Sequence, residues 1–247
     1  MKILLIGAGN MGGAILAGMD RSAVTVVEAY APRADELRKM HPEVSVVEVI
    51  PSLEGFVVIL AVKPQSLAGM AFEGRARALI SILAGTSIAS LRAKIEAEAY
   101  IRAMPNLAAL HQKAITSVTG DVSFREEALT ILSGIGQAVW LESEEHLDIA
   151  TGLGGSAPAW LALVAEALVD GAVEMGLPRE TALVYLPMLF EGTGALLGEE
   201  DPAQLRARVS SPGGTTIAGL EALDRAGTHE AFVEAMRACY RRAQELS

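Results

Sequence analysis

The feature that most constrains this chain is a glycine pattern directly after its first apolar run. Residues 3–6 predict a buried strand, and Gly7-Ala8-Gly9-Asn10-Met11-Gly12 follows with the spacing G-x-G-x-x-G. We expect Gly7 to make the tight turn, Gly9 to let the backbone approach a pyrophosphate, and Gly12 to let the next helix pack on the strand. The helix N-terminus would then hold the diphosphate of a dinucleotide. The alternative is a strand-to-helix turn that binds nothing.

Apolar runs alternate with helical patterns along the first 120 residues, and helices dominate from Ser123 onward. Strands are expected at residues 3–6, 24–28, 44–49, 56–61, 78–83, 100–102, 114–118 and 139–141. Helices are expected at residues 10–19, 33–40, 124–132 and 143–151. This alternation predicts an α/β fold with an N-terminal Rossmann-like, doubly wound sheet that carries helices on both faces.

Only helices are expected in the rest of the chain, at residues 158–175, 181–197, 203–209, 215–223 and 228–246. A chain of 247 residues is long enough for a nucleotide domain and a second unit. We therefore predict a dinucleotide-binding domain over residues 1–150 and an all-helical domain over residues 151–247.

The expected helix at 158–175 predicts how the chain assembles. Its large apolar residues are Trp160, Leu161, Leu163, Val164, Leu168, Val169 and Val173. A helix that is apolar nearly all round is central to a domain or buried between subunits. Because the second domain is too small to surround many such helices, we predict a homodimer formed through it.

Charge is distributed unevenly along the chain. The net charge is −10, to which residues 1–120 contribute +2 and residues 121–247 contribute −12. Nucleic-acid binding is not expected, because a phosphate backbone needs a basic face. The slightly basic first part suits an anionic cofactor, and the acidic second part is explained by a solvated surface.

The remaining composition points to a cytoplasmic protein without a metal site. The single cysteine, Cys239, excludes an intramolecular disulfide and is expected on a helix. No cleavable leader is expected at the start, and the four histidines lack ligand spacing. The longest apolar helical stretch, 158–169, contains Glu166 and stops at Asp170, so we expect no membrane span.

Two residues near the second expected strand bear on the choice of dinucleotide. An acid at the strand end accepts the ribose 2′-hydroxyl of NAD, whereas an arginine there suits the 2′-phosphate of NADP. Glu28 has the right spacing from Gly7, but we place it inside the strand. Arg33 is placed in the following turn, where it can fork onto a phosphate. We favour NADPH as the cofactor, with NADH as the second choice. The alternative is that either residue is a plain surface charge that binds no cofactor.

Two further strand ends carry polar residues. The carboxyl ends of parallel strands line the cofactor crevice, so Lys63 in Ala61-Val62-Lys63-Pro64-Gln65 is a candidate for the nicotinamide side. Its alternative is a solvated loop lysine. Asn106 ends Arg102-Ala103-Met104-Pro105-Asn106 and offers a donor and an acceptor. Its alternative is an asparagine that caps the turn.

The segment Ser210–Thr216 combines small hydroxyl residues with two glycines in an otherwise helical, acidic region. Gly213 and Gly214 expose backbone N–H groups, and a helix is expected to begin near Thr215. Such a turn suits a small anionic substrate. The alternative is an N-capping turn that binds nothing.

Five segments, in this order along the whole chain, resemble pyrroline-5-carboxylate reductases. They are Gly7–Met11, Ala61–Gln65, Arg102–Asn106, Thr151–Trp160 and Ser211–Leu220. The resemblance implies reduction of the C=N bond of 1-pyrroline-5-carboxylate to L-proline with NAD(P)H. The resemblance and the polar residues at the strand ends together predict which residues bind the cofactor. These are Gly7, Gly9, Asn10, Met11, Gly12, Arg33, Ala61, Lys63, Pro64 and Asn106.

The resemblance also implies roles in the second domain. Ser211 and the amides of Gly213 and Gly214 would hold the substrate carboxylate, beside the helix start at Thr215. Thr216 would lie near the ring nitrogen and is the candidate catalytic residue, relaying a proton from water. If the dimer forms as predicted, this turn would complete the active site of the partner subunit's nucleotide domain.

Four features depart from the family pattern. Gly154 stands where the family usually has Ser, Ala157 where it has Gly, and Trp160 where it has Tyr. These three lie in an expected loop before a helix and bear on substrate positioning. The turn at Pro32-Arg33 lacks the Asn-Arg pair common in relatives, which bears on the cofactor.

Two other functions are weighed. A 3-hydroxyacid dehydrogenase of the 6-phosphogluconate dehydrogenase type has a similar domain order but uses a lysine in its second domain. The last lysine here is Lys113, so that base is absent. A non-catalytic dinucleotide sensor would keep the Gly7 loop and would not need an anion-binding turn at Ser211–Thr216.

Overall fold

The computed structural model describes residues 1–246, which form two compact units. The first unit is Met1–Ser156 together with the C-terminal stretch from Ala238, and the second is Ala157–Arg237. The hydroxyl of Tyr240 donates a 2.8 Å hydrogen bond to Glu145, and this bond raises the pKa of the phenol. The end of the last helix is therefore tied to the first unit.

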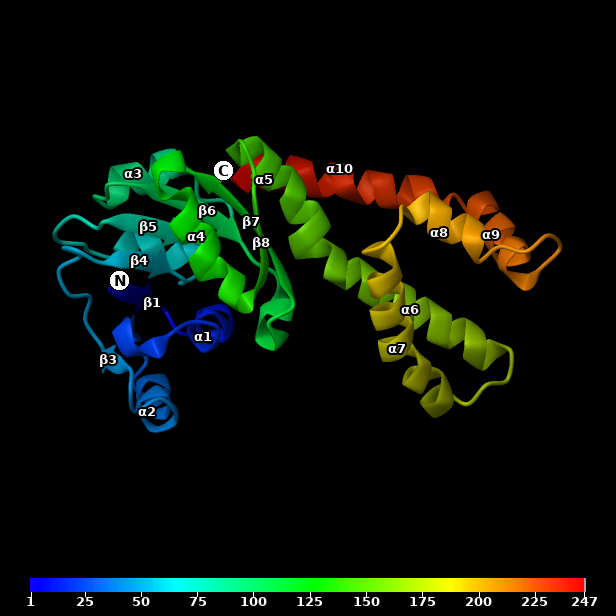
Figure 1. The fold of residues 1–247 in the computed structure, drawn as a ribbon, viewed down its shortest axis with the longest axis horizontal. Coiled ribbons are helices and arrows are strands. Elements are labelled where there is room, and N and C mark those ends of the chain that lie inside the picture. Colours follow the sequence, from blue (N-terminus) through cyan, green and yellow to red (C-terminus); the bar gives the residue numbers. More distant parts are fainter. Residues whose placement is uncertain (247) are drawn as a thin grey trace. The chain divides into compact units, whose positions relative to one another are not determined.

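An eight-stranded sheet forms the first unit, in the order β3-β2-β1-β4-β5-β6-β7-β8 (Figure 1). The strands are β1 (Ile3–Ile6), β2 (Val24–Val27), β3 (Ser45–Val47), β4 (Val57–Leu60), β5 (Ala78–Ser81), β6 (Tyr100–Met104), β7 (Ala114–Gly120) and β8 (Gly136–Trp140). The chain runs outward from β1 to β3 and returns to the other side of β1 with β4. The predicted doubly wound sheet is confirmed, and its switch point lies between β1 and β4.

Apolar clusters cover both faces of this sheet. Ile3 and Leu5 belong to one cluster, whereas Leu4 and Ile6 belong to the other, because successive side chains of a strand point to opposite faces. Helices α1 (Asn10–Ala17), α2 (Ala31–Met40) and α4 (Arg125–Leu132) contribute to the first cluster, and α3 (Ile88–Lys94) contributes to the second. Burial on both faces explains why these strands are continuous apolar runs in the sequence.

One strand runs against the others. β7 pairs antiparallel with β6, whereas every other pairing in the sheet is parallel. The connection from β6 to β7 spans residues 105–113 and holds the short 3-10 helix η3 (Leu107–His111). A parallel crossover needs about a dozen residues or more, so this connection is too short to return the chain to the same edge.

A wide helical turn follows the sheet. Helix α5 (Glu144–Ala150) continues through the π-helical segment Thr151–Ser156 into α6 (Ala157–Glu174). The prediction of a loop around Gly154 is therefore wrong, because the chain stays helical there and forms a wider turn. π-helical turns are rare and occur frequently at functional sites.

The second unit is entirely helical, as predicted. It contains α6, α7 (Arg179–Leu197), α8 (Pro202–Arg208), α9 (Thr215–Arg225) and most of α10 (Thr228–Leu246). Of residues 157–237, the buried apolar ones are Val169, Ala182 and Leu205. Large apolar side chains stay exposed in this unit, among them Leu161, Leu163, Leu168, Leu183, Val184, Tyr185, Met188 and Leu189.

The π-helical segment also changes the expectation about a membrane span. Because it joins α5 to α6, Glu144–Glu174 is one helix of 31 residues, long and apolar enough to cross a membrane by length and composition. The bent pair Arg179–Leu197 and Pro202–Arg208 passes the same test as a unit. An apolar helix buried between two protein subunits has the same composition, so this finding alone assigns no membrane.

Candidate functional site

The glycine loop between β1 and α1 has the backbone that its sequence predicts. Gly7 has φ +92, and a Cβ atom there would lie 2.8 Å from the carbonyl oxygen of Ala61. A Cβ atom on Gly12 would collide with the carbonyl oxygen of Gly7. Both positions therefore need glycine, one for a left-handed turn and the other for close helix-to-strand packing.

Open space lies over Gly9 and the start of α1. A Cβ atom on Gly9 would meet nothing within 4 Å. Gly9 is also the N-cap residue, with extended backbone and no side chain bonded to the first turn of α1. The first-turn N–H groups, including those of Asn10 and Met11, therefore have no side-chain cap and form the positive end of the helix dipole. This geometry fits the diphosphate of a dinucleotide.

Glu28 and Arg33 both bind the backbone of Ala8. The backbone N–H of Ala8 donates to Glu28 Oε2 at 3.1 Å, and Arg33 Nε donates to the Ala8 carbonyl at 3.1 Å. β2 ends at Val27, so Glu28 lies just beyond the strand and not inside it as predicted. Helix α2 begins at Ala31, so Arg33 lies in its first turn and not in the preceding loop, because Pro32 is tolerated in a first turn.

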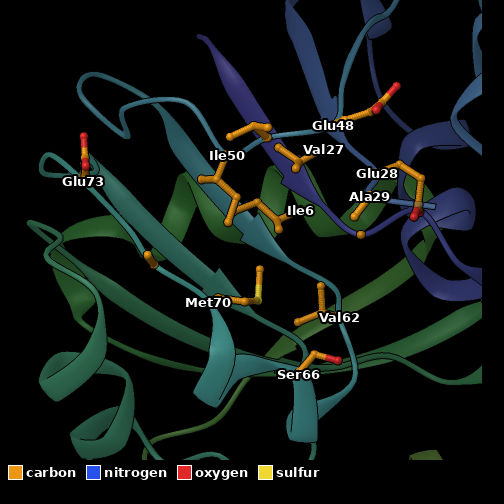
Figure 2. A pocket seen from close by; sticks show the side chains of 13 residues that line it. Ile6, Val27, Glu28, Ala29, Glu48, Ile50, Val62, Ser66, Met70 and Glu73 are labelled. Atoms are coloured by element: carbon orange, nitrogen blue, oxygen red, sulfur yellow. The ribbon is translucent and has the colours of Figure 1, made fainter. Parts of the chain in front are cut away.

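A pocket of about 590 Å³ opens beside the glycine loop, at the carboxyl ends of β1 and β2 (Figure 2). Ile6 and Val27 form an apolar wall on one side, and Figure 2 shows Met70, Val62 and Ser66 on the other. Glu28, Glu48 and Glu73 also line it. A second hollow, of about 480 Å³, is lined by Gly9, Asn10, Glu28, Tyr30, Pro32, Arg33 and Glu36. Glu28 lines both spaces.

The segment after β4 borders the same loop. The N–H of Ala61 donates to the Ile6 carbonyl at 2.8 Å, and this bond aligns the ends of β4 and β1. Lys63 is exposed, and Pro64 follows it as the first residue of the 3-10 helix η2 (Pro64–Gly69). Ala61 thus lies against Gly7, while Lys63 lies at the carboxyl end of the neighbouring strand. Its predicted contact with the nicotinamide remains a prediction.

Asn106 does not cap the turn after β6. It occupies the N-cap position of η3, but its side chain makes no capping hydrogen bond. Its Nδ2 instead donates to the carbonyl of Gly154 at 2.9 Å, within the π-helical segment. Its buried Oδ1 has no hydrogen-bond partner among the described residues. A fixed amide with an unsatisfied buried acceptor fits a ligand contact better than a structural cap.

The Ser210–Thr216 turn belongs to the second unit and has an open backbone. Gly213 has φ +69, and the N–H of Gly214 donates to the Ser211 carbonyl at 3.0 Å. Helix α9 begins at Thr215 with Gly214 as its N-cap and with no side-chain cap. Ser211 and Thr215 are exposed, and Thr216 is half-buried. This arrangement can present backbone donors and hydroxyl groups to a small anion.

Some of the predicted residues are brought together by the structure. Ala61 lies against Gly7 and Gly12, and Arg33 binds the Ala8 carbonyl in the same loop. Ser211 and Thr216 lie in the separate helical unit. Sequence reasoning missed the hydrogen bond from Ala8 to Glu28. Its signal was the spacing of Glu28 from the glycine loop, which is that of an acid at the end of the second strand.

Models of two protein families match the chain. The model described as "Pyrroline-5-carboxylate reductase dimerisation" matches residues 144–246. The model described as "NADP oxidoreductase coenzyme F420-dependent" matches residues 2–85. The first model covers α5 to α10, and the second covers the glycine loop and the pocket beside it.

Curated relatives match over the full length. A pyrroline-5-carboxylate reductase of Synechocystis sp. is 38% identical, covering 100% of this chain and 98% of the relative. The reductase of Thermus thermophilus is 36% identical with the same coverage.

A solved pyrroline-5-carboxylate reductase from Coxiella burnetii matches the structure with a TM-score of 0.87 and 27% identity, covering 100% of this chain and 98% of that one. The Streptococcus pyogenes enzyme gives a TM-score of 0.83 at 27% identity, covering 99% and 98%. Sequence and structure agree over both units, and the chain belongs to the pyrroline-5-carboxylate reductase family.

Proposed function

We propose that this protein reduces 1-pyrroline-5-carboxylate to L-proline with NADPH or NADH, which is the last step of proline biosynthesis. The observation that carries the proposal is the full-length match to reductases of this name at up to 38% identity. The uncapped helix starts at Asn10 and Thr215 provide an anion-binding geometry for each of the two ligands.

The first unit holds the dinucleotide. The N-terminus of α1 binds the diphosphate through the backbone around Gly9, and Arg33 lies beside the adenosine ribose. Ala61, Lys63, Pro64 and Asn106 follow strand ends that line the crevice toward the nicotinamide. The Oδ1 atom of Asn106 is an acceptor for an amide or hydroxyl donor there.

The second unit holds the substrate. Ser211 and the amides of Gly213 and Gly214 bind the carboxylate. No side chain caps this helix start, and the Gly214 N–H exchanges its bond to the Ser211 carbonyl for the ligand. The positive end of α9, which begins at Thr215, adds to this anion site.

Protonation of the ring nitrogen controls the reaction. A bound reduced nicotinamide supplies the hydride that reaches the imine carbon, and the nitrogen carries or receives a proton in the same step. The Thr216 hydroxyl donates a hydrogen bond to this nitrogen and relays a proton from water. The chain contributes mainly by holding the ring in place for transfer.

Assembly is part of the proposal. The exposed apolar residues of α6 and α7 form the contact surface of a homodimer, which is supported by the family model over residues 144–246. The sequence predicts that the turn of one chain serves the nucleotide unit of its partner. Mixing a variant that is inactive in the glycine loop with one that is inactive in the turn then restores activity. A cytoplasmic location is supported by the single cysteine.

Steady-state reduction of pyrroline-5-carboxylate with NADPH and NADH side by side tests the function. We expect loss of the nicotinamide absorbance with this substrate, and a slower rate with a six-membered cyclic imine. Cofactor binding without any loss of absorbance would identify a dinucleotide sensor and overturn the proposal.

A further inference from the structure

A buried arginine on β6 has no part in the reaction as described so far. The side chain of Arg102 is 5% exposed. Its Nη1 donates to Glu144 Oε1 at 2.7 Å, and its Nη2 donates to Asp148 Oδ1 at 3.3 Å. Glu144 and Asp148 are four residues apart on α5, so Arg102 binds one face of that helix. Desolvation offsets much of the attraction in a buried ion pair, so what the rigid guanidinium contributes here is geometry more than stability.

Glu144 extends this network to the segment after β5. Its Oε1 also accepts the backbone N–H of Ile88, the first residue of α3, at 2.9 Å. One carboxylate oxygen therefore joins α5 both to β6 and to the start of α3. Because the carboxyl ends of parallel strands line the cofactor crevice, the segment between β5 and α3 lies at that edge of the sheet.

Packing alone does not fix the distance between α5 and these strands. A cavity of about 160 Å³ is lined by Leu83 and Gly85 after β5, by Arg102 and Met104 of β6, and by Asp148 and Thr151. Side chains that border a cavity lose contact atoms on that side. The ion pairs of Arg102 therefore hold α5 in place where close packing is incomplete.

The same strand and helix are joined a second time further along both segments. Asn106 follows Arg102 by four residues, and its Nδ2 donates to the Gly154 carbonyl at 2.9 Å. Gly154 follows Asp148 by six residues and lies in the π-helical segment. A Cβ atom on Gly154 would lie 3.2 Å from Ile115 Cγ2, so this segment already lies close to β7. A displacement of α5 would therefore move the Gly154 carbonyl relative to the Asn106 amide.

We propose that Arg102 is a positioning residue for hydride transfer. By binding Glu144 and Asp148 it keeps the Gly154 carbonyl within reach of Asn106 Nδ2, and this bond orients the amide whose Oδ1 is left as an acceptor. Arg102 itself touches neither ligand. A misplacement of about 1 Å can slow a positioned reaction about 100-fold. This inference rests on the proposed function, which supplies the hydride transfer.

The variant Asp148→Ala removes one acceptor of Arg102 and leaves its ion pair with Glu144, so the protein is expected to fold. We expect kcat to fall about 10- to 100-fold. The affinity for NADPH and the KM for pyrroline-5-carboxylate should not change, because the diphosphate and the carboxylate bind elsewhere. With NADPH deuterated at the transferred position, the isotope effect on kcat should increase, because hydride transfer becomes the slow step.

Two further variants make this result specific. Asp148→Asn keeps an oxygen that accepts from Arg102 Nη2, and it should retain most of the turnover. Glu127→Ala is the matched control, since Glu127 pairs with Arg77 at 3.4 Å in the same unit and lines no part of the cavity. It should leave kcat unchanged. An unchanged kcat in Asp148→Ala, or an equal loss in Asp148→Asn, would overturn the proposal.

Hydrogen exchange of residues 151–156 with NADP⁺ bound gives a measurement that does not depend on turnover. We expect faster exchange in Asp148→Ala than in the wild type and in Asp148→Asn. Unchanged exchange would overturn the proposal even if turnover fell. If exchange becomes faster but the wild type does not reduce pyrroline-5-carboxylate, the reductase assignment fails and the hold of Arg102 on the π-helical segment stands. If the wild type reduces it but neither kcat nor exchange moves in Asp148→Ala, the assignment stands and the role of Arg102 fails.

Discussion

The two units bury their apolar side chains to very different extents. In the first unit, Leu4, Leu5, Ile59 and Leu60 are completely or almost completely covered by their own chain. In residues 157–237, Val169, Ala182 and Leu205 are the buried apolar residues, and α6 and α7 leave many others exposed. The first unit therefore has a complete core within one chain, whereas the second has the composition of a surface that a second copy covers.

A charge on the exposed face of α7 is expected to have the largest effect. Val184 is 74% exposed in the single chain. Val184→Asp would place a carboxylate on the apolar surface that we propose as the dimer interface, and we expect dissociation and loss of activity by about 100-fold or more. Light scattering and steady-state turnover measure both effects.

Val122→Asp is the matched control, because Val122 is 71% exposed but lies in the first unit. We expect it to remain dimeric and active. If the two variants had the same oligomeric state and turnover, the exposed apolar surface of the second unit would not be a dimer interface.

A side chain on Gly12, where α1 packs closely against the end of β1, is expected to have the next largest effect, on dinucleotide binding. Gly12→Ala puts a methyl group against the carbonyl oxygen of Gly7, so the loop must move and dinucleotide affinity should fall by about 100-fold. Gly13→Ala is the control, since its Cβ atom would first meet Arg33 Nη2 at 3.4 Å. Titration of NADPH fluorescence compares them. Similar affinities for the two variants would show that close packing at Gly12 does not support the site.

Removing the hydroxyl of Thr216 should leave the dinucleotide site intact and slow the reaction. We expect Thr216→Ala to lower kcat by about 10- to 100-fold, the low end of what a positioned proton donor supplies. Thr216→Ser keeps the hydroxyl and should retain most of the turnover. Unchanged kcat in Thr216→Ala would exclude this residue from the mechanism.

The sequence predicted the central strands and long helices well for a physical reason. Buried parallel strands such as Ile3–Ile6 are continuous apolar runs, and long helices such as Arg179–Leu197 carry a clear pattern. Helix α3 was missed because Ser87, whose hydroxyl accepts from the Ser90 N–H, was its one clear start signal. Helices α5 and α8 have the same length but stronger signals: two glutamates in the first turn of α5, and Asp201 followed by Pro202 at the start of α8.

Long-range contacts were beyond a sequence reading. Asn106 contacts the Gly154 carbonyl 48 residues away, and no local pattern predicts that the chain forms a π-helical turn there. Glu28 had the correct spacing, but a strand boundary is uncertain by a few residues from sequence. That uncertainty decided whether Glu28 was placed inside the strand or just beyond its end.

The central claim is that the two units divide the two ligands of one reaction, and a variant of the turn tests it most directly. Gly213→Val places a β-branched residue at φ +69, which distorts the backbone donors of the turn. We predict unchanged NADPH affinity and a KM for pyrroline-5-carboxylate raised about tenfold or more, in a protein that is folded by circular dichroism. Weakened NADPH binding with an unchanged KM would contradict the account.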